Sequence, residues 1–255
     1  MIYDLLAPFY DSYNGDINYT AWADFIEKII SRDYTLGKPE LVLDLGCGTG
    51  SMTLQLAERG YDMTGIDYSC EMLDIAKNRA ALCGFGDKIL WLCQDMREFE
   101  LYGTVDVAVC CLDGINHLTS LGDLDKCLSL VHNYLIPDGL FIFDINGKYK
   151  FENVYSDRAY AMEEGNALCL WQNYYNGKTG LCDFYITLFV SGKDGRYDRY
   201  DEIQREKMYT LRMIKNALKR NSLEFIGAYS DFDFSEASDY DERIYVVARC
   251  KKGAK

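Results

Sequence analysis

The sequence has no long hydrophobic run and comparatively few positive charges. It contains no apolar stretch of about 18 residues, and its first residues lack a basic segment followed by an apolar run, so we expect neither a membrane span nor a signal peptide. Lys and Arg number 27 against 40 Asp and Glu, a formal net charge of −13. Nucleic-acid binding relies on cations that displace counterions, so we expect no nucleic-acid partner.

Histidine is also scarce, with two residues in the chain. The ten cysteines form no C-x-x-C pair and have no histidine at zinc spacing, so we expect no metal site. They are scattered over predicted strands and helices, and we interpret them, including the neighbours Cys110 and Cys111, as reduced core thiols of a cytoplasmic protein. The length of 255 residues and the 49% hydrophobic content predict one compact unit of enzyme size.

Short apolar runs alternate with helical patterns through the first part of the chain. Such alternation predicts an α/β fold with a mostly parallel sheet covered on both faces. The expected helices are residues 19–30, 52–59, 70–82 (capped by Ser69) and 123–134, and the expected strands are residues 41–45, 62–66, 89–93, 105–111 and 140–143.

The sequence pattern changes after the fifth expected strand. Strand-like stretches at residues 167–175 and 181–191 are separated by turn residues, and a helix capped by Thr210 precedes two last strands at residues 223–229 and 244–250. We interpret residues 149–208 as an antiparallel β insertion and not as an independent domain. The core then comprises residues 1–148, with an N-terminal helical arm, and residues 209–255.

A glycine-rich turn, Asp44-Leu45-Gly46-Cys47-Gly48-Thr49-Gly50, joins the first strand to its helix. Glycines at this place permit a tight turn and let backbone N–H groups approach a ligand at a helix N-terminus. A dinucleotide fingerprint requires Gly or Ala where this chain has Ser51. The turn therefore predicts a nucleotide-like ligand and counts against a nicotinamide cofactor without excluding it.

Acidic residues follow the next two strands. Asp67 ends the second strand, where a carboxylate can accept both hydroxyls of a ribose or can cap the following turn. The third strand ends in Cys93-Gln94-Asp95-Met96, where Asp95 can accept from an adenine amino group and the N–H of Met96 can donate. Signals at three successive strand ends predict one elongated adenosine ligand.

These residues resemble the class I S-adenosylmethionine-dependent methyltransferases, and more narrowly small bacterial members that include aminosugar N,N-dimethyltransferases. The resemblance implies a Rossmann-like sheet with an antiparallel last strand and S-adenosyl-L-methionine as cofactor, with S-adenosyl-L-homocysteine as product. It implies that the β insertion is a lid over the acceptor site. The implied cofactor residues are Asp44, Gly46, Cys47 and Gly48 at the turn, Asp67, Tyr68 and Met72 at the ribose and adenine, Gln94, Asp95 and Met96 at the adenine edge, Cys111 after the fourth strand, and the N-terminal tyrosines Tyr3, Tyr10, Tyr13 and Tyr19.

The acceptor side offers fewer signals. His117 follows the fourth strand and is the candidate general base, whereas His132 lies in an amphipathic helix, where a packing or surface role is expected. Asp144 and Asn146 end the fifth strand and can face the acceptor or cap the next turn. The charged stretch around Glu202 indicates a solvated strand face. The alternative is that one of its carboxylates lies near a cationic acceptor.

Three functional hypotheses remain at this point. The first is methyl transfer to nitrogen or oxygen of a small molecule, in which in-line positioning supplies most of the catalysis. The second is a nicotinamide-dependent oxidoreductase of similar fold, and the third is a non-catalytic protein that binds S-adenosylmethionine. A homodimer is left open.

Overall fold

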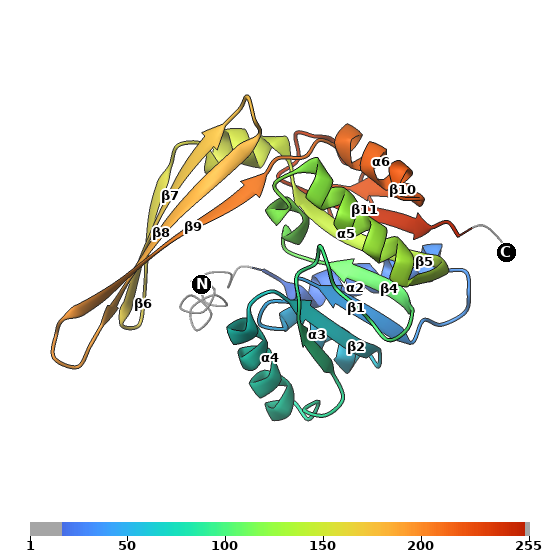
Figure 1. Cartoon of the computed structure of the whole chain (residues 1–255), viewed down its shortest axis with the longest axis horizontal. Helices are drawn as coiled ribbons and strands as arrows, with labels where there is room; N and C mark the ends of the chain where they lie inside the picture. The colour runs from blue at the N-terminus through green and yellow to red at the C-terminus, as the bar shows by residue number, and fades with distance from the viewer. Residues whose placement is uncertain (1–16, 253–255) are drawn as a thin grey trace.

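Two sheets form the fold of residues 17–252, the part of the chain that the computed structural model describes (Figure 1). The larger sheet has seven strands in the order β10-β11-β5-β4-β1-β2-β3. Strands β1 to β5 pair in parallel, and β11 runs antiparallel between β5 and β10, as expected. Its strands are β1 (Leu41–Leu45), β2 (Asp62–Asp67), β3 (Leu90–Cys93), β4 (Val105–Cys110), β5 (Leu135–Asn146), β10 (Leu223–Tyr229) and β11 (Arg243–Cys250).

Helices cover both faces of this sheet because its strands are apolar on both sides. One core cluster packs α5 and α6 against the sheet, and a second packs α2 and α3 against the other face. The helices are α2 (Tyr19–Asp33), α3 (Ser51–Glu58), α4 (Cys70–Leu82), the short 3₁₀ helix η1 (Gly114–His117), α5 (Leu121–Tyr134), the π-helical turn η2 (Lys150–Tyr155) and α6 (Leu211–Arg220).

The helix starts confirm the expected caps. The Ser69 hydroxyl accepts from the N–H of Met72 at 3.2 Å, and the Thr210 hydroxyl accepts from the N–H of Met213 at 3.3 Å. Each hydroxyl satisfies a backbone donor that the first helical turn leaves without a partner. These short-range contacts explain why the start of both helices was predictable from sequence.

Parallel pairing brings the ends of several strands to one edge of the sheet. Leu45 of β1 lies opposite Ile66 of β2, and Asp67 lies opposite Cys93 of β3. The glycine turn and the segments that follow β2 and β3 therefore meet at the carboxyl edge, where open α/β sheets bind their ligands.

The β insertion forms a separate antiparallel sheet in the order β6-β7-β8-β9. It extends to the left in Figure 1, and its inner face has its own cluster of buried residues around Phe151 and Phe184. The edge strand β6 was not predicted because it is short and mostly exposed, without an apolar run. The four strands are β6 (Ala159–Glu164), β7 (Ala167–Asn176), β8 (Leu181–Ser191) and β9 (Tyr197–Lys207).

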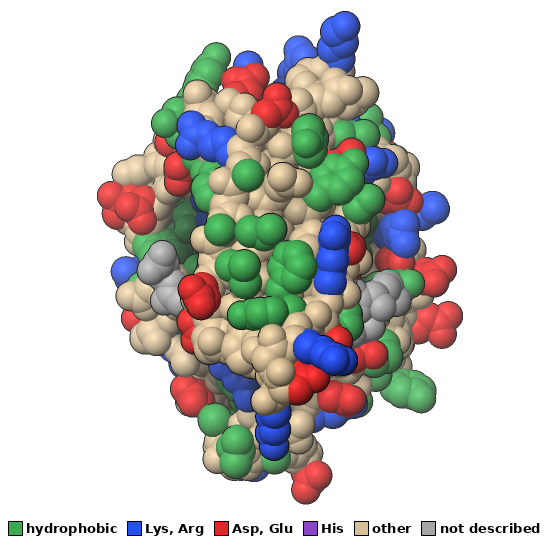
Figure 2. All heavy atoms as spheres, turned by 90° about the vertical axis from the view of Figure 1, so that its left-hand side faces the viewer, with side chains coloured by type: hydrophobic (Ala, Val, Ile, Leu, Met, Phe, Trp, Pro, Cys, Tyr) green, Lys and Arg blue, Asp and Glu red, His purple; other side chains and the backbone are tan. Residues whose placement is uncertain are grey.

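The outer face of this sheet carries exposed apolar side chains. Tyr185 lies opposite Ile203 in the β8–β9 pairing and contacts Tyr174 edge to face at 5.4 Å. Figure 2, which views the molecule from this side, shows hydrophobic side chains gathered at the centre of the face with charged side chains around them. Along each strand, side chains point alternately to the buried inner face and to this outer face, as is typical of an antiparallel sheet with one covered face.

Candidate active site

The glycine turn is held against the end of β2. The N–H groups of Gly46 and Cys47 both donate to the carbonyl of Ile66, at 2.8 and 2.9 Å, and the N–H of Gly48 donates to Asp67 Oδ2 at 2.8 Å. These three N–H groups therefore donate within the protein, to acceptors at the end of β2. The turn fixes the position of the Asp67 carboxylate.

Asp67 has hydrogen bonds to both of its oxygens. Oδ1 accepts from the N–H of Ser69 at 2.9 Å, while Oδ2 accepts from Gly48. Burial raises the pKa of this carboxyl, and the backbone donors of Ser69 and Gly48 oppose the rise. A carboxylate offers about four lone-pair positions, so both oxygens can still accept a second donor.

Asp44 lies next to Asp67 at the same end of the site. Its side chain is 1% exposed and accepts from the Thr53 hydroxyl at 2.6 Å. Burial raises the pKa of Asp44 to about 7, and the neighbouring Asp67 adds to the rise. Two carboxyls whose pKa values are raised in one pocket mark a candidate functional site.

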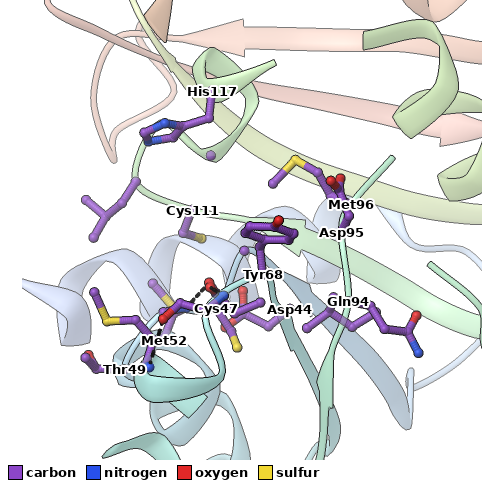
Figure 3. Close-up of a pocket in the computed structure, with 18 of the residues that line it drawn as sticks. Asp44, Cys47, Thr49, Met52, Tyr68, Gln94, Asp95, Met96, Cys111 and His117 are labelled. Atoms are coloured by element: carbon purple, nitrogen blue, oxygen red, sulfur yellow. Dashed lines mark hydrogen bonds between the residues drawn. The ribbon is translucent and has the colours of Figure 1, made fainter. Parts of the chain in front are cut away.

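A cavity of about 370 Å³ opens above these residues at the carboxyl edge of the sheet (Figure 3). A volume of this order suits a small-molecule ligand. Tyr3, Tyr10 and Tyr13 lie outside the described residues. The other candidate cofactor residues and the candidate base all line this cavity: Tyr19, Asp44, Gly46, Cys47, Gly48, Asp67, Tyr68, Met72, Gln94, Asp95, Met96, Cys111 and His117.

Further lining residues were not among the candidate site residues named from the sequence. Most are neighbours of the candidates along the chain, and proximity to the motifs was the available signal. They are Thr49, Ser51, Met52, Ile66, Ser69, Arg97, Leu112, Gly114 and Leu118.

The end of the cavity near β3 has one exposed aromatic ring and two polar side chains that hydrogen-bond within the protein. Tyr68 is 58% exposed, and its ring lies over the cavity in Figure 3. The Gln94 side chain turns toward Glu100, and its Oε1 accepts from the N–H of Glu100 at 2.7 Å. Asp95 Oδ1 accepts from Arg97 Nε at 2.9 Å, and this Arg97 contact lowers the pKa of Asp95.

His117 lies across the cavity from Asp44 and Cys47 (Figure 3). Burial lowers the pKa of its imidazole below the usual value, while the carboxylates of Asp113 and Asp67 oppose this shift. The ring is therefore neutral near neutral pH, the form in which it can accept a proton. His132 is half-buried in α5, where a ring nitrogen lies 3.3 Å from the carbonyl of Lys251 and away from the cavity.

The segment between β4 and η1 makes a sharp turn to place His117. Leu112 and Asp113 both have left-handed backbone conformations, with φ of 58° and 54°. Non-glycine residues avoid this region unless surrounding contacts enforce it. Asp113 is held by Arg243 Nη2, which donates to Oδ1 at 3.0 Å, and its own N–H donates to Asp144 Oδ2 at 3.0 Å.

Asp144 and Asn146 do not line the cavity, so of the two roles considered for them the cavity does not support direct contact with the acceptor. Both are fully buried. Asp144 pairs with Arg243, and Asn146 donates to Glu206 Oε2 at 3.1 Å. Strand β5 extends further than its apolar run suggested, which carries both side chains beneath η1 and the insertion.

Glu206 is a buried carboxyl that the sequence did not indicate. It lies in β9, opposite Cys182 of β8, and is 5% exposed. Burial and, second, the Asp113 carboxylate raise its pKa to about 8. The surrounding charged stretch suggested a solvated strand face, but side chains alternate along a strand and every second one here turns inward.

One pair of cysteines corrects the expectation of reduced thiols throughout. Cys70 at the start of α4 and Cys93 at the end of β3 form a disulfide across 23 residues of sequence. The bond lies between the segments that carry Tyr68 and Gln94. Among the eight free cysteines, all but Cys83 are buried, as expected for core thiols.

The sheet order and the position of the cavity are those of Rossmann-like α/β proteins that bind nucleotide cofactors. Residues 42–139 match a family model described as a methyltransferase domain. The chain is 30% identical over 99% of its length to YqeM of Bacillus subtilis, a protein named as a methyltransferase, and covers 98% of that relative. A solved S-adenosylmethionine-dependent methyltransferase from Clostridium acetobutylicum is 29% identical and superposes with a TM-score of 0.86, covering 99% of this chain and 100% of that one.

A third relative, a dTDP-3-amino-3,6-dideoxy-alpha-D-glucopyranose N,N-dimethyltransferase from Streptomyces fradiae, is 31% identical over 42% of this chain and 40% of its own length. The chain belongs to the class I S-adenosylmethionine-dependent methyltransferase family. It is thus a methyltransferase with S-adenosylmethionine as cofactor. The nicotinamide-dependent alternative is not supported. In the described part of the chain, no helix is both long and apolar enough to span a membrane.

Proposed function

We propose that this enzyme transfers the methyl group of S-adenosylmethionine to a nitrogen or oxygen atom of a small molecule, and that the transfer takes place in the 370 Å³ cavity. The observation that carries the proposal is that the candidate cofactor residues and His117 line opposite sides of one cavity (Figure 3). The bound cofactor supplies a methyl group on a sulfonium, which is a good leaving group.

The acidic end of the cavity supports a cationic cofactor. Asp67, fixed by Gly48 and Ser69, accepts the ribose hydroxyls, and the segment from Gly46 to Gly48 faces the methionine portion. Asp44 adds a second carboxyl at this end. Negative side chains favour the ammonium and sulfonium charges of the cofactor, because attraction between opposite charges is strong away from bulk water.

The adenine end lies between β2 and β3. Tyr68 and Met72 flank the ring, and Asp95 with the N–H of Met96 meets its edge. Tyr68 is exposed and Met72 is buried, so the two differ in how much surface they offer to the ring. The disulfide between Cys70 and Cys93 holds these two walls together.

His117 removes the proton that the acceptor must lose. A nucleophilic nitrogen or oxygen needs a free lone pair, and the neutral imidazole can take the proton from an N–H or O–H group. The remaining contribution is positioning, since in-line alignment of acceptor and methyl group converts the reaction to an intramolecular one. The β insertion is the lid that encloses the acceptor.

Thermal shift with cofactors tests the binding part of this proposal. S-adenosylmethionine and S-adenosylhomocysteine should stabilise the enzyme by about 2.7 kcal/mol at 100 times the dissociation constant, and NAD should not. Asp67→Asn should weaken both sulfur ligands, while Asp62→Asn, an exposed change at the start of the same strand, should not. Stabilisation by NAD and none by the sulfur nucleosides would overturn the proposal.

A second assay tests the transfer. Amines, hydroxy compounds and sugar nucleotides are incubated with the enzyme and S-adenosylmethionine, and release of S-adenosylhomocysteine is measured. We expect turnover with a small-molecule acceptor and its loss in His117→Ala. Turnover with a protein or nucleic-acid acceptor alone would contradict the small-molecule part of the proposal.

A further inference from the structure

Three side chains beside the cavity form a compact group of acceptor atoms. Asp113, His117 and Glu206 each offer one nitrogen or oxygen atom, and these atoms all lie within 4.8 Å of one another. His117 lines the cavity, and Asp113 lies one residue from its lining residues Leu112 and Gly114. Glu206 reaches the group from β9 of the insertion, so the group lies where the two sheets meet.

The charges around this group do not balance. Among the described residues, the carboxyls of Asp113, Asp144 and Glu206 face two cations, Arg243 and Lys150. Arg243 pairs with both Asp113 and Asp144, and Lys150 Nζ donates to the Asn146 side chain at 3.0 Å. A buried carboxylate needs a compensating charge or proton.

Glu206 carries that proton when nothing else compensates its charge. Burial and, second, the Asp113 carboxylate raise its pKa to about 8, so its carboxyl is mostly protonated at neutral pH. Lys150, Arg243 and the Asn146 hydrogen bond act in the opposite direction. The charged and titratable groups near it come from every neighbouring element: Asp113 and His117 beside η1, Asp144 in β5, Lys150 and Tyr155 in η2, Cys182 in β8 and Arg243 in β11.

We propose that Asp113, His117 and Glu206 together bind the protonated amine of the methyl acceptor, and that Glu206 makes the enzyme select amines over alcohols. This inference rests on the proposed function, in which the acceptor reaches the cavity beside His117 and loses its proton there. Glu206 contacts the acceptor from the insertion, so the insertion contributes to specificity as well as to enclosure.

The spacing and the charge both suit an ammonium group. Three N–H donors of one ammonium, each about 2.8 Å from its acceptor, hold the acceptors about 4.6 Å apart. One positive charge matches the excess of one carboxyl over the two cations among these described residues. A divalent metal ion would bring two charges next to Arg243 and Lys150, which disfavour it.

Binding of propylammonium to the enzyme saturated with S-adenosylhomocysteine tests this subsite, with propan-1-ol as the uncharged probe of matched shape. We expect propylammonium to bind and propan-1-ol to bind at least tenfold more weakly. Because Glu206 must release its proton first, affinity for propylammonium should rise about tenfold per pH unit up to about pH 8 and then level off.

Glu206→Gln supplies the matched variant, since its amide oxygen can still accept from Asn146. It should lower affinity for propylammonium more than tenfold at about pH 8.5 and remove the pH dependence. Asp201→Asn removes a carboxylate from the same strand, on a side chain that is 54% exposed, and should behave as the wild type.

Equal binding of the two probes, a flat pH profile in the wild type, or unchanged affinity in Glu206→Gln would each overturn the subsite. Tight binding of Mg²⁺ or Zn²⁺ that Glu206→Gln abolishes would overturn it in favour of a metal site. Absence of stabilisation by S-adenosylhomocysteine in the wild type would instead overturn the proposed function. If Glu206→Gln does not fold, the comparison of the two probes and the pH profile in the wild type still test the subsite.

Discussion

Asn116 Nδ2 donates to the backbone carbonyl of Lys207 at 2.8 Å, and this bond joins the helix that carries His117 to the last strand of the insertion. The other end of the same side chain, Oδ1, accepts from the N–H of Asn146 at 2.9 Å. Asn116 is fully buried, so one amide fixes η1 to both sheets. The position of the candidate base therefore depends on the insertion.

Replacing Asn116 by Ala should lower both stability and activity. The change leaves the carbonyl of Lys207 and the N–H of Asn146 without their partner, at a cost of about 1–3 kcal/mol for each buried group. Urea unfolding measures the loss, and Asn133→Ala, an exposed change in α5, is the control. Equal stability of the two variants would contradict the bridging role.

His117→Ala should lower kcat by about 10²- to 10⁴-fold and leave binding of S-adenosylhomocysteine nearly unchanged. Burial lowers the pKa of the wild-type imidazole, so kcat at saturating acceptor should rise with pH with a midpoint below about pH 6.5. His132→Ala should keep both the rate and the pH profile. Wild-type turnover in His117→Ala would remove this residue from the mechanism.

Gly50→Ala and Gly84→Ala separate backbone strain from steric conflict. Both glycines have left-handed conformations, with φ of 78° and 81°. A Cβ at Gly50 would lie 2.8 Å from the Trp91 ring, whereas a Cβ at Gly84 meets nothing within 4 Å. Both variants should lose about 1–2 kcal/mol, and Gly50→Ala should lose about 1–3 kcal/mol more. Denaturant unfolding gives the difference, and a difference of zero would refute the clash.

Reduction of the Cys70–Cys93 disulfide should lower stability by about 3 kcal/mol, the entropy of closing a loop of this length. Because the bond joins the segments on either side of the proposed adenine site, affinity for S-adenosylhomocysteine should fall as well. Thermal unfolding with and without a reductant measures the first effect, and calorimetry the second. Cys83→Ser, at an exposed free thiol, should change neither, and the same result for Cys70→Ser in oxidised protein would argue against the bond.

Glu206→Gln should gain stability relative to the wild type as pH rises from about 5 to about 8. The folded-state pKa of Glu206, about 8, lies above the unfolded value of about 4.3, so the folded state holds a proton that the unfolded state has lost. Wild-type stability therefore falls over this range, by no more than about 1.4 kcal/mol per pH unit from this group. Urea unfolding at several pH values tests the sign of this change in the free energy of unfolding. The difference in that free energy between Asp201→Asn and wild type should stay constant over the same pH range.

The sequence determined the sheet, most of its helices and the cofactor side of the candidate site. Asp44, Asp67 and Asp95 each follow an apolar run, and parallel pairing brings the ends of such runs to one edge without further information. Ser69 and Thr210 cap their helices through contacts three residues away. These features depend on neighbours along the chain, which a pattern of residues can encode.

Only the tertiary structure decided the acceptor side. Glu206 and Asn146 are 60 residues apart, and their contact depends on how the insertion packs on β5. Cys70 and Cys93 meet because α4 starts beside the end of β3, which spacing alone does not reveal. Burial of a charged side chain depends on all its neighbours at once. For that reason a stretch that reads as solvated strand contains the carboxyl that we assign to the acceptor.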